Sequence, residues 1–582
     1  MPHMRHVTLL ATLAVLLAAG CARSMHESGP SAGAATGAVL STTNPLKFAA
    51  RPTSAAIDPT DLMSRLYVFA DDSMMGRASG HPGNDKGTAY LERELRALGL
   101  EPAGENGTYF QQVLEGRFLT VTTPITVDGR TLALGTDLLA RQSGTGRPRP
   151  FDGARVIYGG VFGDPVRMIP PTLVSGKVVV FTVAPNADGT PAWQANRQGL
   201  TVQYTTAAAV VVATLDAMPA AVRTEHAAPA IALRGGGQQQ PTRTHDAPAF
   251  FYATRSAAEA MLGAPLASVQ VGTEGRVLRG ALGFRTDVAP GRNVIAVLRG
   301  SDPALRNQYV LVGSHNDHEG VAEYAVDHDS LRAYNAVVRP GGADSPMRPA
   351  TSAEQARIRS ILDSLRRLNP RRADNVYNGA DDDGSGSVAM LEIAEAMAKA
   401  ATRPRRSVLF IWHAAEEQGL FGSQYFSEHP TVPRDSIVAG INIDMIGRGN
   451  ASDLRGGGPG YLQLIGSRRL SSELGDLVEA VNRDRGHALA FDYQYDASNH
   501  PEQYYCRSDH YNYARWGIPV VFFSTGGHRD YHQLTDEPQY IDYDKLARVS
   551  RFIHDVTLRL ATLDRRPTVD KPKPDPYGDC RQ

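Results

Sequence analysis

The stretch SVLFIWHAAEEQGLFGS, residues 407–423, places two adjacent glutamates just after an apolar run. The run 407–412 has the length and composition of a buried strand, and Glu416 and Glu417 follow it closely. Burying an ionised carboxylate without a partner costs several kcal/mol, unless the group takes up a proton. A nearby cation would remove this cost, so it is a better explanation of the pair than a solvated surface position. The stretch therefore predicts a strand that ends at a cation-binding site.

Similar apolar runs on both sides of this stretch alternate with amphipathic segments. Runs of strand length occur at 293–298, 309–313, 440–446, 461–466 and 519–523. Apolar residues recur at helical spacing in 387–400 and 545–563. This alternation predicts an α/β fold in which helices flank a mixed β-sheet. Ligands of such sheets bind beyond the carboxyl ends of the strands, so the residues that follow each run are the candidate site.

Metal-ligand side chains follow these strands. They are His315, Asp382, Glu416, Glu417, Asp444 and His532. Any one motif alone has a plain explanation, such as a polar loop, an acidic turn or a solvated glutamate pair, but all of them together favour a metal site. Imidazoles and carboxylates without a thiolate suit zinc, with manganese or cobalt as substitutes.

Five motifs resemble, in their order, those of the dinuclear-zinc aminopeptidases of metallopeptidase family twenty-eight. They are HND, NGADDDGSG, AAEEQGLFGS, NIDMIGR, and SDHYNYARWGIPVVFF followed by DYHQLTDE. Residues 71–113 are similar to the helical opening of such enzymes. Residues from about 125 to 278 resemble the protease-associated domain that many members carry as an insertion. The resemblance implies a zinc-exopeptidase fold with a β-rich inserted domain.

The same resemblance implies two Zn²⁺ ions per chain that share Asp382. His315 and Asp444 would complete one zinc site, and Glu417 and His532 would complete the other.

Three further residues take roles from the resemblance. Asp317 would hold the ring of His315 in one tautomer, and Glu416 would be the general base for the attacking water. Tyr531 would either donate to the oxyanion or serve in packing. Asp509 and Asp536 are expected to be structural. Ser508 is not expected to be a nucleophile, because no GxSxG turn surrounds it.

The implied activity is that of an aminopeptidase, which releases N-terminal residues of peptides. Four alternatives stay open: a carboxypeptidase, a dipeptidase, a glutaminyl cyclase of the same fold, and a catalytically silent binding protein. The complete ligand set argues against the last two. A formal net charge of -1 argues against broad attraction to nucleic acid. Peptides are the partners that the resemblance implies.

The segment between His315 and Asp382 is long. It contains an insert at 319–376 with charged and helical parts, which is a candidate lid over the metals. His318 and His328 are expected at the surface or in a loop.

The N-terminus has the layout of an export signal. Residues 1–21 combine a positive start, a short apolar run and the sequence LAAGC, which resembles a lipobox with lipidation of Cys21. The expected location is the outer membrane, facing the periplasm. An oxidising compartment would allow Cys506 and Cys580 to form a disulfide, but two free thiols are an equal alternative.

The expected domain layout follows from these segments. Residues 22–58 are a flexible tether, 121–280 a protease-associated domain with strand-like runs at 177–183 and 207–215, and 565–582 a disordered tail. The peptidase domain takes the remaining segments, 59–120 and 281–564.

Overall fold

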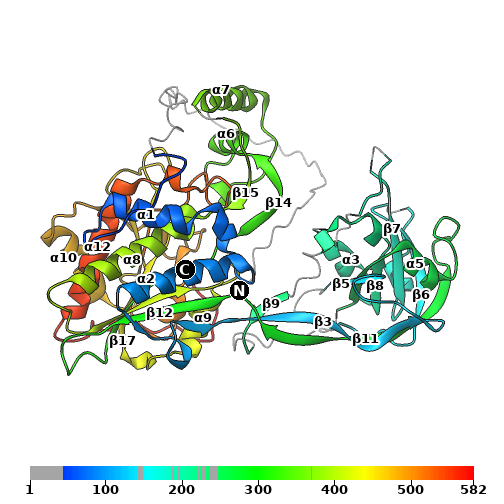
Figure 1. Cartoon of the computed structure of the whole chain (residues 1–582), viewed down its shortest axis with the longest axis horizontal. Coiled ribbons are helices and arrows are strands. Elements are labelled where there is room, and N and C mark those ends of the chain that lie inside the picture. Colours follow the sequence, from blue (N-terminus) through cyan, green and yellow to red (C-terminus); the bar gives the residue numbers. More distant parts are fainter. Residues whose placement is uncertain are drawn as a thin grey trace, which may run out of the picture. The chain divides into compact units, whose positions relative to one another are not determined.

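The computed structural model describes residues 44–582 except 142–147, 165, 187–188, 194–196, 221, 224–229, 236–246 and 369. The predicted signal, the lipidation site at Cys21 and the first part of the predicted tether lie outside the described residues. The chain divides into two compact units (Figure 1). Unit 2 is Leu114–Ala289, and unit 1 comprises the described residues up to Val113 together with Pro290–Gln582.

The described part of unit 1 contains a nine-stranded mixed sheet. Its order is β1 (Glu101–Pro102), β12 (Arg292–Leu298), β16 (Ser407–His413), β13 (Tyr309–His315), β17 (Ile437–Ile443), β20 (Val520–Ser524), β18 (Tyr461–Ile465) and β19 (Ala490–Asp492), with β2 (Phe110–Gln112) paired to β12. The four central strands, β16, β13, β17 and β20, are parallel. Their carboxyl ends therefore share one edge of the sheet, and the predicted α/β class is confirmed.

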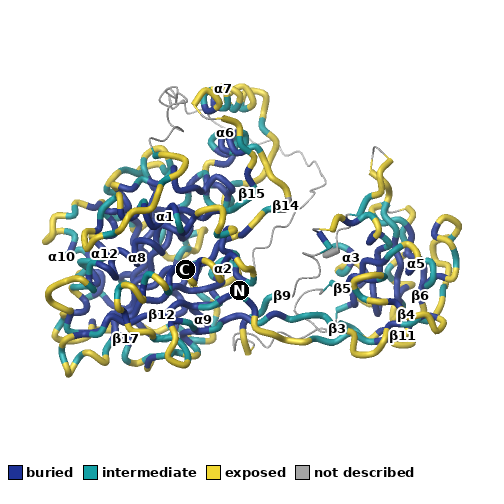
Figure 2. The backbone as a smooth tube through the Cα atoms, in the orientation of Figure 1, coloured by how far each residue is buried: buried dark blue, intermediate teal, exposed yellow. Residues whose placement is uncertain are grey.

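Helices cover both faces of this sheet. One face carries α1 (Pro59–Phe69), α2 (Pro82–Ala97), α8 (Gly386–Lys399), α10 (Ser472–Asp484) and α12 (Tyr543–Thr562), and the other carries α9 (Phe421–Glu428) and α11 (His510–Ala514). Alternation within the strands explains the two layers: Val294 and Ala296 of β12 join the first core, whereas Ile295 and Val297 join the second. Buried residues accordingly concentrate in the sheet and along the helix faces that meet it (Figure 2).

The insert between β13 and α8 is a small substructure of its own. It consists of β14 (Gly320–Asp327), α6 (His328–Val338), the short helix η6 (Gly342–Asp344), α7 (Ser352–Leu368) and β15 (Ala373–Tyr377). The two strands pair antiparallel, and the helices meet through Ala333, Ile361 and Leu365 (Figure 1). The helical content predicted for 319–376 is confirmed.

Unit 2 is rich in strands. Its described residues form β4 (Arg130–Thr131), β3 (Leu114–Val127), β11 (Glu274–Val288), β6 (Ala154–Phe162), β7 (Val178–Val183), β8 (Ala209–Val212), β10 (Ala249–Ala253) and β5 (Leu138–Arg141) in sheet order, with β9 (Ala230–Leu233) on β3 and helices α3 (Arg197–Gln203) and α5 (Arg255–Leu262). The strands expected at 177–183 and 207–215 are β7 and β8. The expected boundaries, 121 and 280, fall inside β3 and β11, which pair with each other along most of their length.

Two segments expected to be flexible or disordered instead contact unit 1. In the predicted tether, the Asn44 side chain donates to the carbonyl oxygens of Gln539 and Ile541. In the predicted disordered tail, Cys580 forms a disulfide with Cys506, with the two Cα atoms 5.8 Å apart. Composition reveals only that such segments lack a core of their own, and these long-range contacts supply the order. Within the described residues, the structure contains no helix that combines the length and the apolar character of a transmembrane span.

A buried ion cluster joins α1, α2 and α8 beneath the sheet. Arg65, which is 3% exposed, donates from Nε to Oε1 of Glu392 at 2.5 Å and from Nη1 to Oε2 of Glu94 at 2.9 Å, and it also pairs with Glu395. One buried guanidinium therefore links α1 to carboxylates of α2 and α8.

We expect Arg65→Met to lower the free energy of unfolding of unit 1 by about 3 to 5 kcal/mol, because it leaves the buried Glu392 without its cation, whereas Glu395 keeps its pair with Lys399. Urea denaturation followed by circular dichroism measures the change. The control is Arg483→Met, which removes a highly exposed pair with Asp484 and should leave stability unchanged. Equal stability of the two variants would contradict the importance of the cluster.

Candidate metal centre

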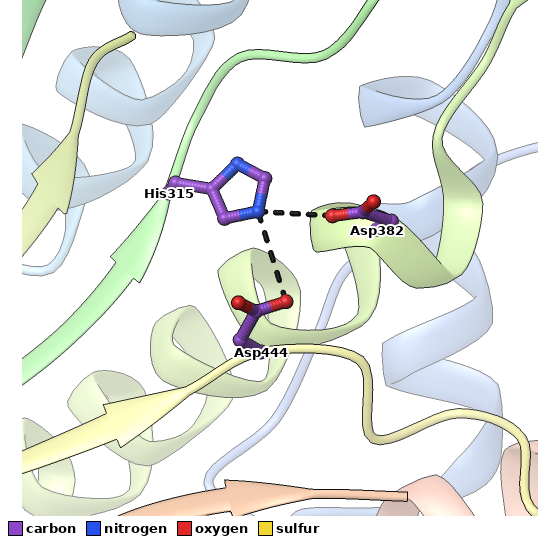
Figure 3. Close-up of side chains that lie close together, drawn as sticks. All are labelled: His315, Asp382 and Asp444. Carbon is purple, nitrogen blue, oxygen red and sulfur yellow. Dashed lines mark hydrogen bonds and ion pairs between the residues drawn. The ribbon is translucent and has the colours of Figure 1, made fainter. Parts of the chain in front are cut away.

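Three predicted ligands meet where the parallel strands end (Figure 3). His315 is the last residue of β13, and Asp444 directly follows β17. Asp382 lies in the short helix η7 (Ala380–Ser385), which leads into α8. Nε2 of His315 is 3.0 Å from Oδ1 of Asp382 and 3.7 Å from Oδ1 of Asp444. All three residues are buried.

The other two predicted ligands lie on the opposite side of Asp382. Nε2 of His532 is 2.9 Å from Oδ2 of Asp382 and 3.0 Å from Oε2 of Glu417. Asp382 thus directs one carboxylate oxygen to each histidine, and the five predicted ligands form two groups that share it.

Hydrogen bonds from backbone amides fix the segment that carries Asp382. Asp536 accepts hydrogen bonds from the amides of Asp381 and Asp382, as a structural role for Asp536 predicts. The neighbouring Asp383 accepts from the amides of His315 and Gly386. Within the DDD motif, Asp383 therefore links η7 to β13, whereas Asp382 faces the two histidines.

The outer nitrogens of the two histidines face acceptors. Nδ1 of His315 donates to the backbone carbonyl of Asp317 at 3.1 Å, and Nδ1 of His532 lies 3.3 Å from Oε1 of Glu319. The contact of His315 with Asp317 is therefore closest through the main chain, since the carboxylate is 3.7 Å away. A ring that donates from Nδ1 presents a lone pair at Nε2. Each Nε2 lone pair then faces two carboxylate oxygens, an arrangement that a cation would relieve.

The adjacent glutamates of the opening stretch occupy different environments. Burial and the neighbouring carboxylates raise the pKa of Glu416, whose amide donates to Asp317. Burial also penalises the charged form of Glu417, but His532 and His318 outweigh it and lower its pKa to about 2. Two carboxylates with opposite shifts are the pattern expected of an acid–base group beside an anionic one.

Three residues at the site have left-handed backbone conformations. They are Ala415 (φ +55°), Met445 (φ +58°) and His532 (φ +51°). The first precedes Glu416, the second follows Asp444, and the third is itself a candidate ligand. Left-handed backbone is unfavourable for such residues and gathers at functional sites, where the surrounding structure holds it.

Ser508 has a structural contact rather than a nucleophile's setting. Its hydroxyl donates to Oδ2 of Asp444 at 2.7 Å and accepts from Nδ2 of Asn442 at 2.8 Å. The chain Asn442–Ser508–Asp444 fixes the rotamer of the carboxylate that faces His315. The adjacent Asp509 is buried against His413, with Oδ2 3.1 Å from Nδ1 of the ring.

A hollow of about 500 Å³ opens onto these side chains. Asp382, Glu416, Asp444 and His532 line it together with Tyr531, Arg507 and Asp344. Arg507 donates to the Tyr531 hydroxyl oxygen at 3.2 Å and pairs with Asp344 at 3.3 Å. Asp344 comes from the insert, so the insert contributes to the wall of the hollow.

His318 lies in the loop between β13 and β14, as expected, but it is buried rather than at the surface. His328 is buried at the start of α6, which corrects the expectation of a surface or loop role. Nδ1 of His318 is 2.6 Å from Oε1 of Glu417 and 3.9 Å from Oδ2 of Asp382. Sequence reasoning missed this contact. Its signal was the position of His318 in the HNDH motif, three residues after a predicted ligand.

The insert also supports the loop that carries His532. Arg332 of α6 and Arg448 both donate to Asp530, at 2.8 and 3.0 Å, and the amide of Ala343 donates to the carbonyl of Tyr531. A Cβ on Gly342 would lie 2.4 Å from that same carbonyl, so the close approach requires glycine. The insert therefore packs directly against the loop that carries His532.

The donor set fits divalent metal ions. The first group offers one imidazole nitrogen and two carboxylate oxygens, from His315, Asp382 and Asp444. In the second group, the imidazoles of His318 and His532 both lie beside the carboxylates of Asp382 and Glu417. Such donors have the chemistry of zinc sites that keep a position open for water or substrate. The excess of buried carboxylates over imidazoles matches a bound positive charge.

Comparison with known proteins supports the predicted family. Residues 293–557 match the sequence model of peptidase family M28. A leupeptin-inactivating enzyme of Streptomyces exfoliatus is 41% identical over 91 residues, which cover 15% of this chain and 19% of that protein. An aminopeptidase of Pseudomonas aeruginosa is 34% identical over 137 residues, which cover 22% and 25%. The chain thus matches about a fifth to a quarter of the length of these relatives.

Among solved structures, a zinc aminopeptidase of Bacillus subtilis aligns over 89% of this chain and 99% of that one, with a TM-score of 0.43 and 14% identity. The segment that carries every predicted metal ligand, residues 293–557, is the part of this chain that matches peptidase family M28.

Proposed function

We propose that this protein is a zinc-dependent exopeptidase that binds two Zn²⁺ ions and releases N-terminal residues from peptides. One observation carries the proposal: Oδ1 of Asp382 faces His315 at 3.0 Å, and Oδ2 faces His532 at 2.9 Å. A carboxylate so placed is suited to bridge two cations about 3.5 to 4 Å apart.

The remaining ligands follow from the same geometry. His315 and Asp444 would hold one ion with Asp382, and His532 and Glu417 would hold the other. His318 would act through Glu417: its contact with Oε1 leaves Oε2 directed at His532. When bound, such ions supply a lowered pKa for the attacking water and a polarised scissile carbonyl.

Glu416 is the proposed proton carrier. It lines the hollow beside the ligands, and its raised pKa suits a group that accepts a proton near neutral pH. It would take the proton of the attacking water and give it to the leaving amine. Tyr531 would donate a hydrogen bond from its hydroxyl to the developing oxyanion. Arg507 donates to the oxygen of this hydroxyl, which leaves the O–H free for the substrate.

The matched relatives favour a substrate with a free amino terminus, because an aminopeptidase of Pseudomonas aeruginosa and a probable leucine aminopeptidase of Trichophyton verrucosum are among them. The charges of the hollow do not separate the two ends of a peptide. Asp382 and Asp444 are proposed zinc ligands, and Asp344 is paired with Arg507.

The remaining proposals concern the other parts of the chain. Unit 2 is proposed as a protease-associated domain, which agrees with its strand content and its insertion between Val113 and Pro290. Export with a lipid anchor on Cys21 is supported by the N-terminal sequence pattern and by the disulfide of Cys506 and Cys580, a bond typical of oxidising compartments.

We expect Glu416→Gln to lower kcat by roughly 100- to 10,000-fold while zinc content stays at the wild-type value, because only proton transfer is lost. Its neighbour provides the matched control, since Glu417→Gln should lose zinc as well as activity. Peptidase assays and elemental analysis of the same preparations measure both quantities. Zinc loss in Glu416→Gln, or undiminished turnover, would show that the roles are assigned wrongly.

Ser508→Ala should weaken zinc binding by about 10- to 100-fold, because Asp444 loses the hydroxyl that orients it. Competition against a fluorescent zinc chelator measures the affinity. Activity should return at saturating zinc, which a nucleophilic serine would not allow. Ser436→Ala is the control, since this half-buried residue lies at the opposite end of β17 from Asp444. Unchanged affinity in Ser508→Ala would remove the proposed positioning role.

The choice of substrate end is tested with matched peptides. Aminoacyl anilides with a free amine should be hydrolysed, and their N-acetylated counterparts should not, because an aminopeptidase requires the free amino terminus. Release of C-terminal residues would instead identify a carboxypeptidase, cleavage of dipeptides alone a dipeptidase, and cyclisation of N-terminal glutamine a cyclase. A zinc-loaded protein that converts none of these substrates would favour a binding protein.

A further inference from the structure

A second buried cluster of metal-ligand side chains lies outside the candidate metal centre. It consists of His328 at the start of α6, Asp374 on β15 and Glu537 in the loop that follows His532 and Asp536. One ligand atom from each lies within 4.8 Å of the others, and the residues are 0%, 8% and 4% exposed. None of them belongs to the centre around Asp382.

The three residues have the arrangement of the main centre. Nδ1 of His328 lies 3.3 Å from Oδ1 of Asp329, as Nδ1 of His532 lies near Glu319. Nε2 of His328 then faces the carboxylates, with Oε2 of Glu537 at 3.2 Å. An imidazole whose outer nitrogen is held by a carboxylate and whose inner nitrogen faces further carboxylates is the usual environment of a metal-binding histidine.

Unpartnered buried atoms point to a missing ligand. Nε2 of His328 makes no hydrogen bond despite its distance from Glu537, and Oδ2 of Asp374 has no partner, while its Oδ1 accepts from the amide of Val376. Such orphaned atoms are costly in a buried site unless something absent from the protein itself binds them.

The local charge balance leaves room for a divalent ion. Asp329, Asp374 and Glu537 contribute three carboxylates. Arg372 contributes one guanidinium, which donates to both oxygens of Glu537. The other nearby cation, Arg332, lies over the ring of Tyr540 and pairs with Asp530. Three negative charges against one positive charge leave two to be balanced.

We propose that His328, Asp374 and Glu537 form a separate site for one structural divalent cation of the zinc or manganese class. One imidazole nitrogen and two carboxylate oxygens suit these ions. The ion would join α6 and β15 of the insert to the loop that carries His532, and so fix the insert against the centre. The competing occupant is a proton on His328, paired with Asp329 and Glu537.

The test counts bound zinc in Asp374→Asn and His328→Gln, two near-isosteric variants of the whole chain. Protein stripped with a chelator, reloaded with Zn²⁺ and freed of excess metal is analysed by elemental mass spectrometry, and folding is checked by circular dichroism. Each variant should hold one equivalent of zinc less than wild type. His487→Gln, which removes a histidine paired only with a lone carboxylate, should hold the wild-type amount.

The same comparison in an Asp382→Asn background separates this site from the main centre. Loss of one equivalent on adding Asp374→Asn to that background would support the site even if the main centre binds fewer ions than proposed. Either variant can carry the test if the other fails to fold. Wild-type zinc content in a folded Asp374→Asn or His328→Gln protein would overturn the proposal and assign a proton to His328.

Discussion

The geometry of the site depends on one carboxylate held between two imidazoles. Asp382 can face both His315 and His532 because Asp536 and Asp383 anchor the backbone of η7 through amide hydrogen bonds. Burial opposes a charge on these rings, but the neighbouring carboxylates outweigh it and raise the pKa of His315 and of His532. The fold therefore builds a carboxylate-rich site at the strand edge, whose negative charge is balanced either by protons on the histidines or by bound cations.

Packing around the centre explains how so polar a site stays ordered. The loop with His532 follows β20 and packs against the insert. Arg332 of the insert donates to Asp530 of the loop, and Gly342 lies against the backbone carbonyl of Tyr531. Ser508 likewise orients Asp444, because its hydroxyl donates to Oδ2 of that carboxylate. The same insert contributes Asp344 to the hollow, so support of the ligands and shape of the substrate site are linked in one structure.

Much of the fold, and the meeting of the candidate ligands at one edge of the sheet, could be predicted from strand patterns and from the resemblance of the motifs to a known family. Apolar runs of strand length mark β13, β16, β17 and β20, and parallel strands bring their following residues to one edge. The motif order then indicated which of these residues face each other. The pairing of Glu416 with Glu417 was informative because burial makes two adjacent carboxylates costly.

Other features depend on contacts that sequence patterns do not encode. His318 lies in a loop as expected, yet it is buried against Glu417 and Asp382. His328 is buried at the start of α6 rather than in a loop. The composition of 44–58 and 565–582 suggests flexibility, whereas several long-range contacts hold these segments, among them those of Asn44, Thr53, Cys580 and Gln582. The extent of unit 2 was set by the pairing of β3 with β11, which continues past the expected boundaries.

The position of bound ions tests the central claim most directly. Diffraction from zinc-loaded crystals, collected on both sides of the zinc absorption edge, would locate each ion by its anomalous signal. The account predicts two peaks on opposite sides of the Asp382 carboxylate, one beside His315 and Asp444 and the other beside His532 and Glu417. A single peak at this carboxylate, or none in protein that retains activity, would contradict a shared carboxylate as the basis of the site.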